Sequence, residues 1–262
     1  MYPFNLSRPG SVEAAHQAAG GDARYLAGGQ SLVQSMRLRL ASADTLVDLG
    51  AIESLRSIEV DASTVTVGAM ATHSAVARSA QVREAMPALA ALAAGIGDPM
   101  VRNMGTIGGA IANADPAACY PAAVVGLDAT IVTDRREISG DDFFLGLYET
   151  ALEPAELVVA VRFQIPKRAA YVKFKQPASR FALVGVMVSE GANGVRVGVT
   201  GAKASAYRES TLEAALSRDF SADAIETARV SSEGMNSDLH ASADYRAAMV
   251  VAMAKRAVAA AG

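Results

Sequence analysis

Two glycine-rich segments constrain what this chain can fold into more than any other feature of its sequence. The first is Ala27-Gly28-Gly29-Gln30-Ser31, which follows a predicted strand at Arg24–Ala27 and precedes a predicted helix at Leu32–Leu40. Glycine tolerates positive φ and lets a backbone approach a ligand closely. Unpaired N–H groups at the start of a helix attract phosphate. This segment predicts either a phosphate-binding loop or an ordinary strand-to-helix turn.

The second segment, residues 102–116, has three glycines within five positions and then a run of small residues. The side chains of Thr106 and Asn113 can hydrogen-bond polyol or phosphate oxygens, and Asp115 can accept a hydrogen bond from a hydroxyl. The alternative is a tight turn in which the glycines only let two elements touch. Neither segment has the G-x-G-x-x-G or G-K-[ST] spacing, so neither a Rossmann fold nor a P-loop is predicted.

The composition bounds the class of protein. The chain has 262 residues, of which 51% are hydrophobic and 19% charged, and this is typical of a globular protein. A net charge of −3 without a basic cluster argues against nucleic acid as a partner. The single cysteine, Cys119, excludes internal disulfides and a cysteine-ligated iron–sulfur cluster held by this chain alone. The single cysteine also indicates a reducing compartment, so a cytoplasmic location is expected; no apolar run reaches membrane-spanning length, and the N-terminus lacks the pattern of a signal peptide.

The order of predicted elements changes near Pro166. Before it, strands and helices are mixed, and after it three strands are followed by helices, which is typical of a separate α+β unit. The predicted helices are 11–19, 32–40, 73–78, 87–94, 122–127, 210–216, 222–230 and 243–261, and the predicted strands are 24–27, 45–49, 64–68, 129–133, 157–165, 169–174, 183–189 and 194–200.

The two glycine segments and their flanks resemble the FAD-binding medium subunits of molybdenum hydroxylases, the family of carbon monoxide dehydrogenase and xanthine dehydrogenase. The resemblance covers nearly the whole chain, and the order and spacing of its fragments are more specific than any single one. The fragments lie at residues 27–32, 36–39, 68–73, 96–99, 101–103, 105–109, 114–117, 142–144, 178–182, 237–240 and 245–246.

The resemblance implies an α+β fold of the PCMH/vanillyl-alcohol-oxidase type. In that fold two subdomains hold FAD between them, and a C-terminal α+β domain follows with a three-stranded antiparallel sheet and helices. The expected ranges in this chain are 1–55 and 56–166 for the FAD-binding subdomains and 167–262 for the C-terminal domain.

The resemblance also assigns the residues that contact FAD. The backbone of the first segment and of residues 106–109 is expected to hold the pyrophosphate, while Asn113 and Asp115 follow the ribityl and flavin part. Phe181 is placed near the isoalloxazine ring, and Lys173 or Lys175 could face the cofactor, with at least one of them at a solvated strand edge. The expected FAD-binding residues are Ala27, Gly28, Gly29, Gln30, Ser31, Leu32, Thr106, Ile107, Gly108, Gly109, Asn113, Asp115, Lys175 and Phe181.

By the same resemblance, this chain performs no substrate chemistry, so we expect no catalytic base, nucleophile or metal ligand in it. A large subunit with a molybdenum cofactor is expected to hydroxylate the substrate. A small subunit with two [2Fe–2S] clusters passes electrons to the FAD, which gives them to an external acceptor, and the assembly is expected to be a dimer of heterotrimers. Medium subunits resemble each other across hydroxylases of different substrates, so the choice of substrate is expected to reside in another chain.

Two other functions remain open from the sequence. One is a stand-alone FAD-dependent reductase of the same fold, and the other is an assembly subunit that has lost its flavin. The chain also departs from the family at two positions. Cys119 stands where relatives usually have Asp, which predicts weaker FAD retention than in a Cys119→Asp variant, and Arg37 stands where many have Lys.

Overall fold

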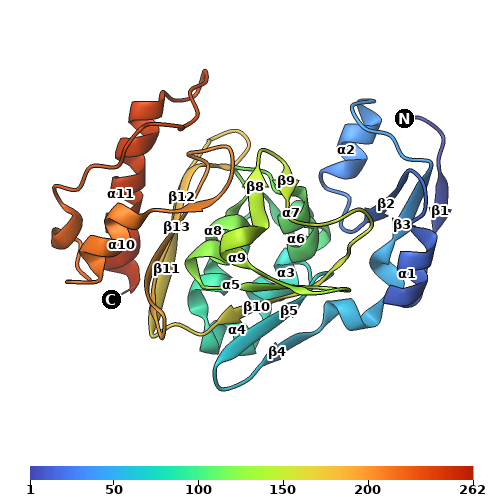
Figure 1. The fold of residues 1–262 in the computed structure, drawn as a ribbon, viewed down its shortest axis with the longest axis horizontal. Coiled ribbons are helices and arrows are strands. Elements are labelled where there is room, and N and C mark those ends of the chain that lie inside the picture. The colour runs from blue at the N-terminus through green and yellow to red at the C-terminus, as the bar shows by residue number, and fades with distance from the viewer. Residues whose placement is uncertain (262) are drawn as a thin grey trace.

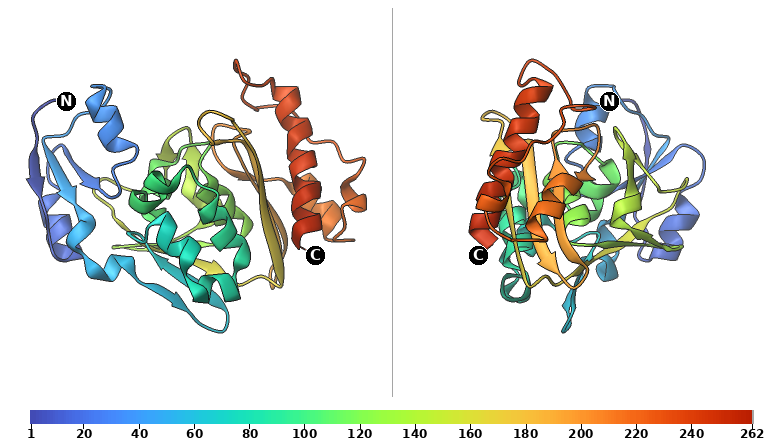
Figure 2. Two further views of the ribbon diagram at one scale, coloured as in Figure 1. Left: turned by 180° about the vertical axis from the view of Figure 1, so that it is seen from behind. Right: turned by 60° about the vertical axis from the view of Figure 1, so that its left-hand side comes forward.

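The computed structural model describes residues 1–261, which form three larger sheets and a two-stranded hairpin, with helices packed between and outside the larger sheets (Figures 1 and 2). The first sheet is parallel, with the strand order β1-β3-β2. Short helices flank it, and two 3-10 turns lead out of it. Its elements are β1 (Asn5–Ser7), α1 (Val12–Ala18), β2 (Ala23–Leu26), α2 (Leu32–Arg37), β3 (Thr45–Asp48), η1 (Leu49–Ala51) and η2 (Glu53–Arg56).

The second sheet is antiparallel and has the order β4-β5-β10-β6-β7. Its strands are β4 (Ile58–Val60), β5 (Thr64–Gly68), β6 (Thr130–Thr133), β7 (Glu137–Ser139) and β10 (Val158–Gln164). The connection from β5 to β6 is helical, and a short hairpin follows β7. These elements are α3 (His73–Arg78), α4 (Ala80–Ala85), α5 (Pro87–Ala94), α6 (Pro99–Met104), α7 (Ile107–Asn113), α8 (Cys119–Gly126), α9 (Gly140–Phe143), β8 (Phe144–Gly146) and β9 (Glu149–Thr150).

The third sheet is antiparallel with the order β11-β12-β13-β14. The three expected strands are present, and a two-residue strand, β14, adds at the edge beside β13. Figure 1 shows this sheet between α8 on one face and α11 on the other. Its elements are β11 (Arg168–Lys175), β12 (Ala182–Gly191), β13 (Gly194–Thr200), β14 (Tyr207–Arg208), α10 (Ser210–Leu216), η3 (Asp223–Ile225) and α11 (Ala243–Ala261).

Helix α8 lies between the second and third sheets, and all eight of its residues are buried. An apolar helix without a polar face is stable only when it is covered on every side. Glycines make the close approach possible, because a Cβ at Gly198 of β13 would lie 2.3 Å from the Ala122 carbonyl oxygen of α8. A Cβ at Gly126 would lie 2.8 Å from the Met187 side chain of β12. The three sheets occupy residues 5–48, 58–164 and 168–208; that they mark three separate domains stays a prediction.

Two helices differ from the prediction. The helix expected at residues 32–40 ends at Arg37, and Arg39 then takes a left-handed conformation with φ of 61°. Of the helix expected at 222–230 only the 3-10 turn η3 forms. Ile225 is the one buried residue in that segment, and a helix with so little apolar surface to bury gains little from packing.

The second glycine segment is also more regular than a loop. Residues 107–113 form α7, which begins at Thr106, whose hydroxyl oxygen accepts a hydrogen bond from Gly109 N at 3.2 Å. The helix ends at Ala114, which is left-handed with φ of 47°. No helix among residues 1–261 is long and apolar enough to cross a membrane.

Candidate functional site

A cavity of about 730 Å³ opens between the first and second sheets and reaches the start of β12. This volume is in the range of pockets that bind small molecules and cofactors. All of the first glycine segment from Ala27 to Leu32 lines it. Six further predicted residues line it as well: Thr106, Gly108, Gly109, Asn113, Asp115 and Phe181. The tertiary structure therefore brings together segments more than 70 residues apart in the chain.

Two of the predicted residues do not line the cavity. Ile107 is fully buried in the hydrophobic core between the second sheet and its helices. Its N–H donates to the Ala71 carbonyl oxygen at 3.1 Å. Lys175 is exposed at the end of β11, while Lys173 lines the cavity. The pairing of β11 with β12 is irregular between Phe174 and Lys175, and such a bulge bends the strands and increases their twist. Lys175 therefore does not continue the face of Lys173.

The first glycine segment offers a row of free donors. Within residues 1–261, the backbone N–H groups of Gly29, Gln30, Ser31 and Leu32 have no hydrogen-bond partner. Gly29 has φ of +70°, which is the left-handed region that favours glycine. The side chain of Gln30 donates to the Gly28 carbonyl oxygen at 3.0 Å and holds the turn closed. Consecutive free N–H groups at the start of a helix are suited to a pyrophosphate.

The second segment differs, because its first N–H groups are already used. Gly108 N donates to the Ala69 carbonyl oxygen at 2.9 Å and Gly109 N to the Thr106 hydroxyl. A Cβ at Gly108 would lie 2.5 Å from the Ala69 side chain, so this glycine serves the packing of α7 against the end of β5. What the second segment presents to the cavity is side chains, above all Asn113 and Asp115.

The two glycine segments touch each other. A Cβ at Gly28 would lie 2.1 Å from the Met104 carbonyl oxygen, and a Cβ at Gly109 would lie 3.3 Å from the Ala27 side chain. The packing interpretation of the glycines therefore holds at these contacts, while phosphate binding by the first segment stays a prediction. The first segment has free donors, and glycine at positions 28, 108 and 109 lets the neighbouring backbones approach.

Polar groups without partners lie on the cavity wall. The hydroxyl of Tyr120 and Nδ1 of His73 are buried and have no hydrogen-bond partner in the described part of the chain. Burial, together with the nearby Arg102 charge, lowers the pKa of His73 to about 4, so its imidazole is neutral at pH 7. Burial raises the pKa of Tyr120 well above its ordinary value. Both residues contribute to the cavity lining, but these two atoms are shielded from it, so two buried polar groups lie unpaired beside the site.

Two carboxylates that line the cavity accept hydrogen bonds from other groups of the protein. Glu156 accepts from Arg136 Nε at 3.0 Å and from Glu153 N at 2.7 Å, and the bonds from Arg136 in particular lower its pKa to about 2. Asp115 accepts from Ala117 N at 2.8 Å and from the hydroxyl of Tyr148, in the turn between β8 and β9, at 3.5 Å. Glu156 was not predicted, and nothing in its sequence context distinguishes it from a surface carboxylate.

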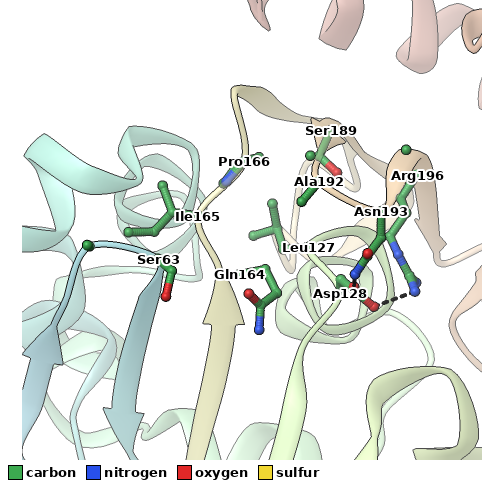
Figure 3. A pocket seen from close by; sticks show the side chains of 13 residues that line it. Ser63, Leu127, Asp128, Gln164, Ile165, Pro166, Ser189, Ala192, Asn193 and Arg196 are labelled. Atoms are coloured by element: carbon green, nitrogen blue, oxygen red, sulfur yellow. Dashed lines mark hydrogen bonds and ion pairs between the residues drawn. The ribbon is translucent and has the colours of Figure 1, made fainter.

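A second cavity, of about 230 Å³, lies where β10 ends and the turn between β12 and β13 approaches it (Figure 3). Arg196 and Asn193 contact Asp128 at its edge. None of the predicted site residues lines this cavity. Among residues 1–261, no group of three or more His, Cys, Asp or Glu side chains could hold a metal ion.

Comparisons with known proteins identify a family for this chain. Residues 2–167 match the family described as the FAD binding domain in molybdopterin dehydrogenase. The chain is 36% identical to the carbon monoxide dehydrogenase medium chain of Hydrogenophaga pseudoflava, over 91% of this chain and 89% of that protein. It is 32% identical to the nicotine 6-hydroxylase medium subunit of Paenarthrobacter nicotinovorans, over 99% and 97%.

Solved structures are similar over the full length. A chain of the Cu,Mo-containing CO dehydrogenase superposes with a TM-score of 0.91 at 32% identity, covering 100% of this chain and 99% of the other. A chain of quinoline 2-oxidoreductase from Pseudomonas putida 86 gives a TM-score of 0.89 at 30% identity, covering 99% and 97%. The glycine-lined cavity, the α+β architecture and these matches together show that the chain belongs to the family of FAD-binding medium subunits of molybdenum hydroxylases.

Proposed function

We propose that this chain is the electron-transfer subunit of a heterotrimeric molybdenum hydroxylase, taking electrons from the [2Fe–2S] clusters of a small subunit and passing them to an external acceptor. The observation that carries the proposal is the row of four free backbone donors at residues 29–32 in a cavity of about 730 Å³. FAD accepts two electrons and returns them singly or as a pair, which suits a relay between one-electron clusters and an acceptor.

The residues of this chain bind and orient the cofactor. The N–H groups of Gly29–Leu32 would hold the pyrophosphate, and the carboxylate of Asp115 and the amide of Asn113 would bond the ribityl part. Phe181 lies at the mouth of the same cavity with 47% of its surface exposed, available to cover an aromatic ring. In such proteins the redox chemistry belongs to the cofactor, so these residues would bind and orient it rather than act on a substrate.

The choice of substrate would reside in the large, molybdenum-containing subunit. The named relatives belong to enzymes of carbon monoxide, nicotine and quinoline, yet this chain matches each of them over nearly its whole length. A fold shared among such different substrates supports an assignment of substrate recognition to another chain. The unpaired Cys119 fits a reducing compartment, and we expect the complex in the cytoplasm.

The test is purification of the tagged full-length chain from cells that also make its partners. The expected complex contains a larger chain with molybdenum, a smaller chain with two [2Fe–2S] clusters and one FAD per heterotrimer, and its mass is expected to be that of a dimer of heterotrimers. Substrate should bleach both the cluster and the flavin absorption bands. A chain that purifies alone and oxidises a free substrate with its own FAD would support a stand-alone reductase instead.

A variant pair tests the role of the flavin within the complex. Asn113→Ala removes an amide from the cavity wall, whereas Asn193→Ala removes one from an exposed turn outside it. Asn113→Ala should give an assembled complex with little FAD, in which substrate still reduces the clusters but electrons no longer reach the acceptor. Electron transfer that persists without FAD, or a wild-type complex that never takes up FAD, would support an assembly role only.

A further inference from the structure

Lys173 of β11 joins three segments of the chain at the cavity wall. Its ammonium donates to the Gly95 carbonyl oxygen at 2.8 Å and to the Arg180 carbonyl oxygen at 2.9 Å, and it lies 3.4 Å from Cys119 Sγ. These contacts use all three N–H groups of a lysine side chain. Gly95 follows α5, Cys119 begins α8 and Arg180 precedes β12, so one side chain links the helices between β5 and β6 to the third sheet.

The segments that Lys173 holds are part of the cavity wall. Residues 178–181 and residues 96–98 both line it, and they are neighbours, since Arg180 Nη1 donates to the Gly97 carbonyl oxygen at 3.4 Å. The turn before β12 is otherwise held mainly by bonds within itself, since Gln176 N donates to the Phe181 carbonyl oxygen at 2.9 Å and Arg180 N to the Gln176 carbonyl oxygen at 2.8 Å, and residues 178–181 are exposed. Arg180 has φ of 63°, a conformation unfavourable for a residue with a side chain. Such a conformation persists only where surrounding contacts impose it, and the bond from Lys173 to its carbonyl group is one of them.

The charge of Lys173 is not neutralised by a carboxylate. Within residues 1–261, no Asp or Glu oxygen lies within ion-pair distance of its ammonium. The group that occupies the third position is the thiol of Cys119, which is only 5% exposed. A positive charge at a partly buried wall acts more strongly on a ligand in the cavity than it would in water.

We propose that Lys173 is a positioning residue of the flavin cavity: it fixes the turn at residues 178–181 against the loop at 95–97, and it presents an uncompensated positive charge that favours the reduced form of the bound flavin. The proposal rests on the proposed FAD-binding function. Reduction adds negative charge to a flavin ring, so a fixed cation at the cavity wall stabilises the reduced cofactor relative to the oxidised one.

The test compares Lys173→Met, Lys173→Arg and the matched control Lys175→Met in the purified complex. Lys175 is two residues away on the same strand but lies outside the cavity. Loss of charge-assisted hydrogen bonds should raise the FAD dissociation constant of Lys173→Met by about tenfold. Its flavin midpoint potential should become more negative. Lys175→Met should change neither quantity, and Lys173→Arg should restore the potential because it keeps the charge.

A second measurement tests whether Lys173 fixes the turn at residues 178–181, and it does not depend on bound FAD. Hydrogen exchange of the amides at residues 178–181 should be faster in Lys173→Met than in wild type and unchanged in Lys175→Met. If Lys173→Met fails to fold, Lys173→Gln serves the same comparison, because it keeps a donor but not the charge. Unchanged potential and unchanged exchange would overturn the proposal about Lys173 while leaving FAD binding intact. A wild-type complex without FAD would instead overturn the proposed function.

A substitution at Cys119 tests the effect of the Lys173 charge independently. Cys119→Asp places a carboxylate beside the ammonium, so the flavin potential should fall, while retention of oxidised FAD should improve over that of wild type. In the Lys173→Met background the same substitution has no cation to neutralise, and its effect on the potential should differ, since contacting residues are not additive. Equal effects of Cys119→Asp in both backgrounds would contradict the pairing, and equal FAD dissociation constants for wild type and Cys119→Asp would contradict the expected gain in retention.

Discussion

Position 28 must be glycine, because the backbone of a neighbouring segment leaves no room for a side chain there. A Cβ there would lie 2.1 Å from the Met104 carbonyl oxygen, and neither backbone can move without displacing the cavity wall. Gly28→Ala should therefore lower the free energy of unfolding by about 1–3 kcal/mol and weaken FAD binding. Chemical denaturation and FAD titration measure the two effects.

The matched control for this substitution is Gly20→Ala. Gly20 lies in an exposed turn after α1, and nothing is within 4 Å of a Cβ placed there. Its stability and FAD affinity should equal those of wild type. The idea that Gly28 serves the contact between the two segments fails if both variants bind FAD and unfold alike.

His73 gives stability a dependence on pH. Its pKa in the folded protein is about 4, against an ordinary value of 6.5. The unfolded chain therefore binds more protons between these values, so stability is present above pH 6.5 and is lost as the pH falls towards 4. From pH 7.5 to pH 5 the group should cost about 2 kcal/mol of unfolding free energy.

Comparison of wild type with His73→Gln over this pH interval isolates that contribution. His73→Gln should lose less stability between pH 7.5 and pH 5 than wild type does. His240→Gln alters an exposed histidine and should keep the wild-type pH dependence. If His73→Gln and wild type show parallel curves, His73 does not remain neutral in the folded protein.

At the scale of elements, β13 anchors the end of the second glycine segment. The hydroxyl of Thr200 lies 2.7 Å from the carbonyl oxygens of both Pro116 and Ala118, and Gly201 N donates to the Pro116 oxygen at 2.7 Å. Thr200 is fully buried, so Thr200→Val keeps the shape and removes the bond. We expect a loss of about 1–2 kcal/mol in the free energy of unfolding, measured by denaturation.

Thr66→Val on β5 is the appropriate control, because the Thr66 side chain makes no hydrogen bond within residues 1–261. It should change stability by less than about 0.5 kcal/mol. A Thr200→Val protein that is as stable as this control would show that the backbone bond from Gly201 is sufficient to hold the segment.

Helix α7 illustrates which elements could be predicted and which could not. Glycine lowers helix propensity, so residues 106–115 looked like a loop. In the fold, Gly108 packs against Ala69, and the Thr106 hydroxyl and two backbone carbonyls accept the first N–H groups of the helix. The Thr106 hydroxyl is local, but the two carbonyls, those of Ala69 and Ala71, follow the end of β5, about 40 residues earlier in the chain. Local propensity cannot include them, so the helix was missed although its cavity residues were found.

At the scale of the whole molecule, the second and third sheets are joined through α8. Arg196 of β13 donates to the Val125 carbonyl oxygen of α8 at 3.0 Å and to Asp141 Oδ1 at 2.8 Å, and it also pairs with Asp128 beside the smaller cavity of Figure 3. Because α8 is covered by both sheets, separation of residues 1–166 from the rest would expose an apolar helix. We therefore expect the two sheets to unfold together.

Gly198→Ala tests this junction, because the new Cβ would lie 2.3 Å from the Ala122 carbonyl oxygen of α8. The substitution should lower the free energy of unfolding by about 1–3 kcal/mol. Circular dichroism and flavin release should still report one transition. Gly191→Ala, whose Cβ would meet only Pro166 at 3.9 Å, should be neutral. A separate, earlier transition for flavin release would show that the sheets unfold independently.

The family, the α+β class and the two glycine segments at the cavity could be read from the amino-acid sequence, because these segments are local patterns with a defined order and spacing. How the residues of the cavity divide their tasks depends on the folded chain. It left the donors of residues 29–32 free, used those of residues 107–109 for packing, and placed Lys173 rather than Lys175 at the cavity. These outcomes depend on which distant backbone lies within hydrogen-bond distance and on a bulge between two strands, and neither is encoded in local periodicity.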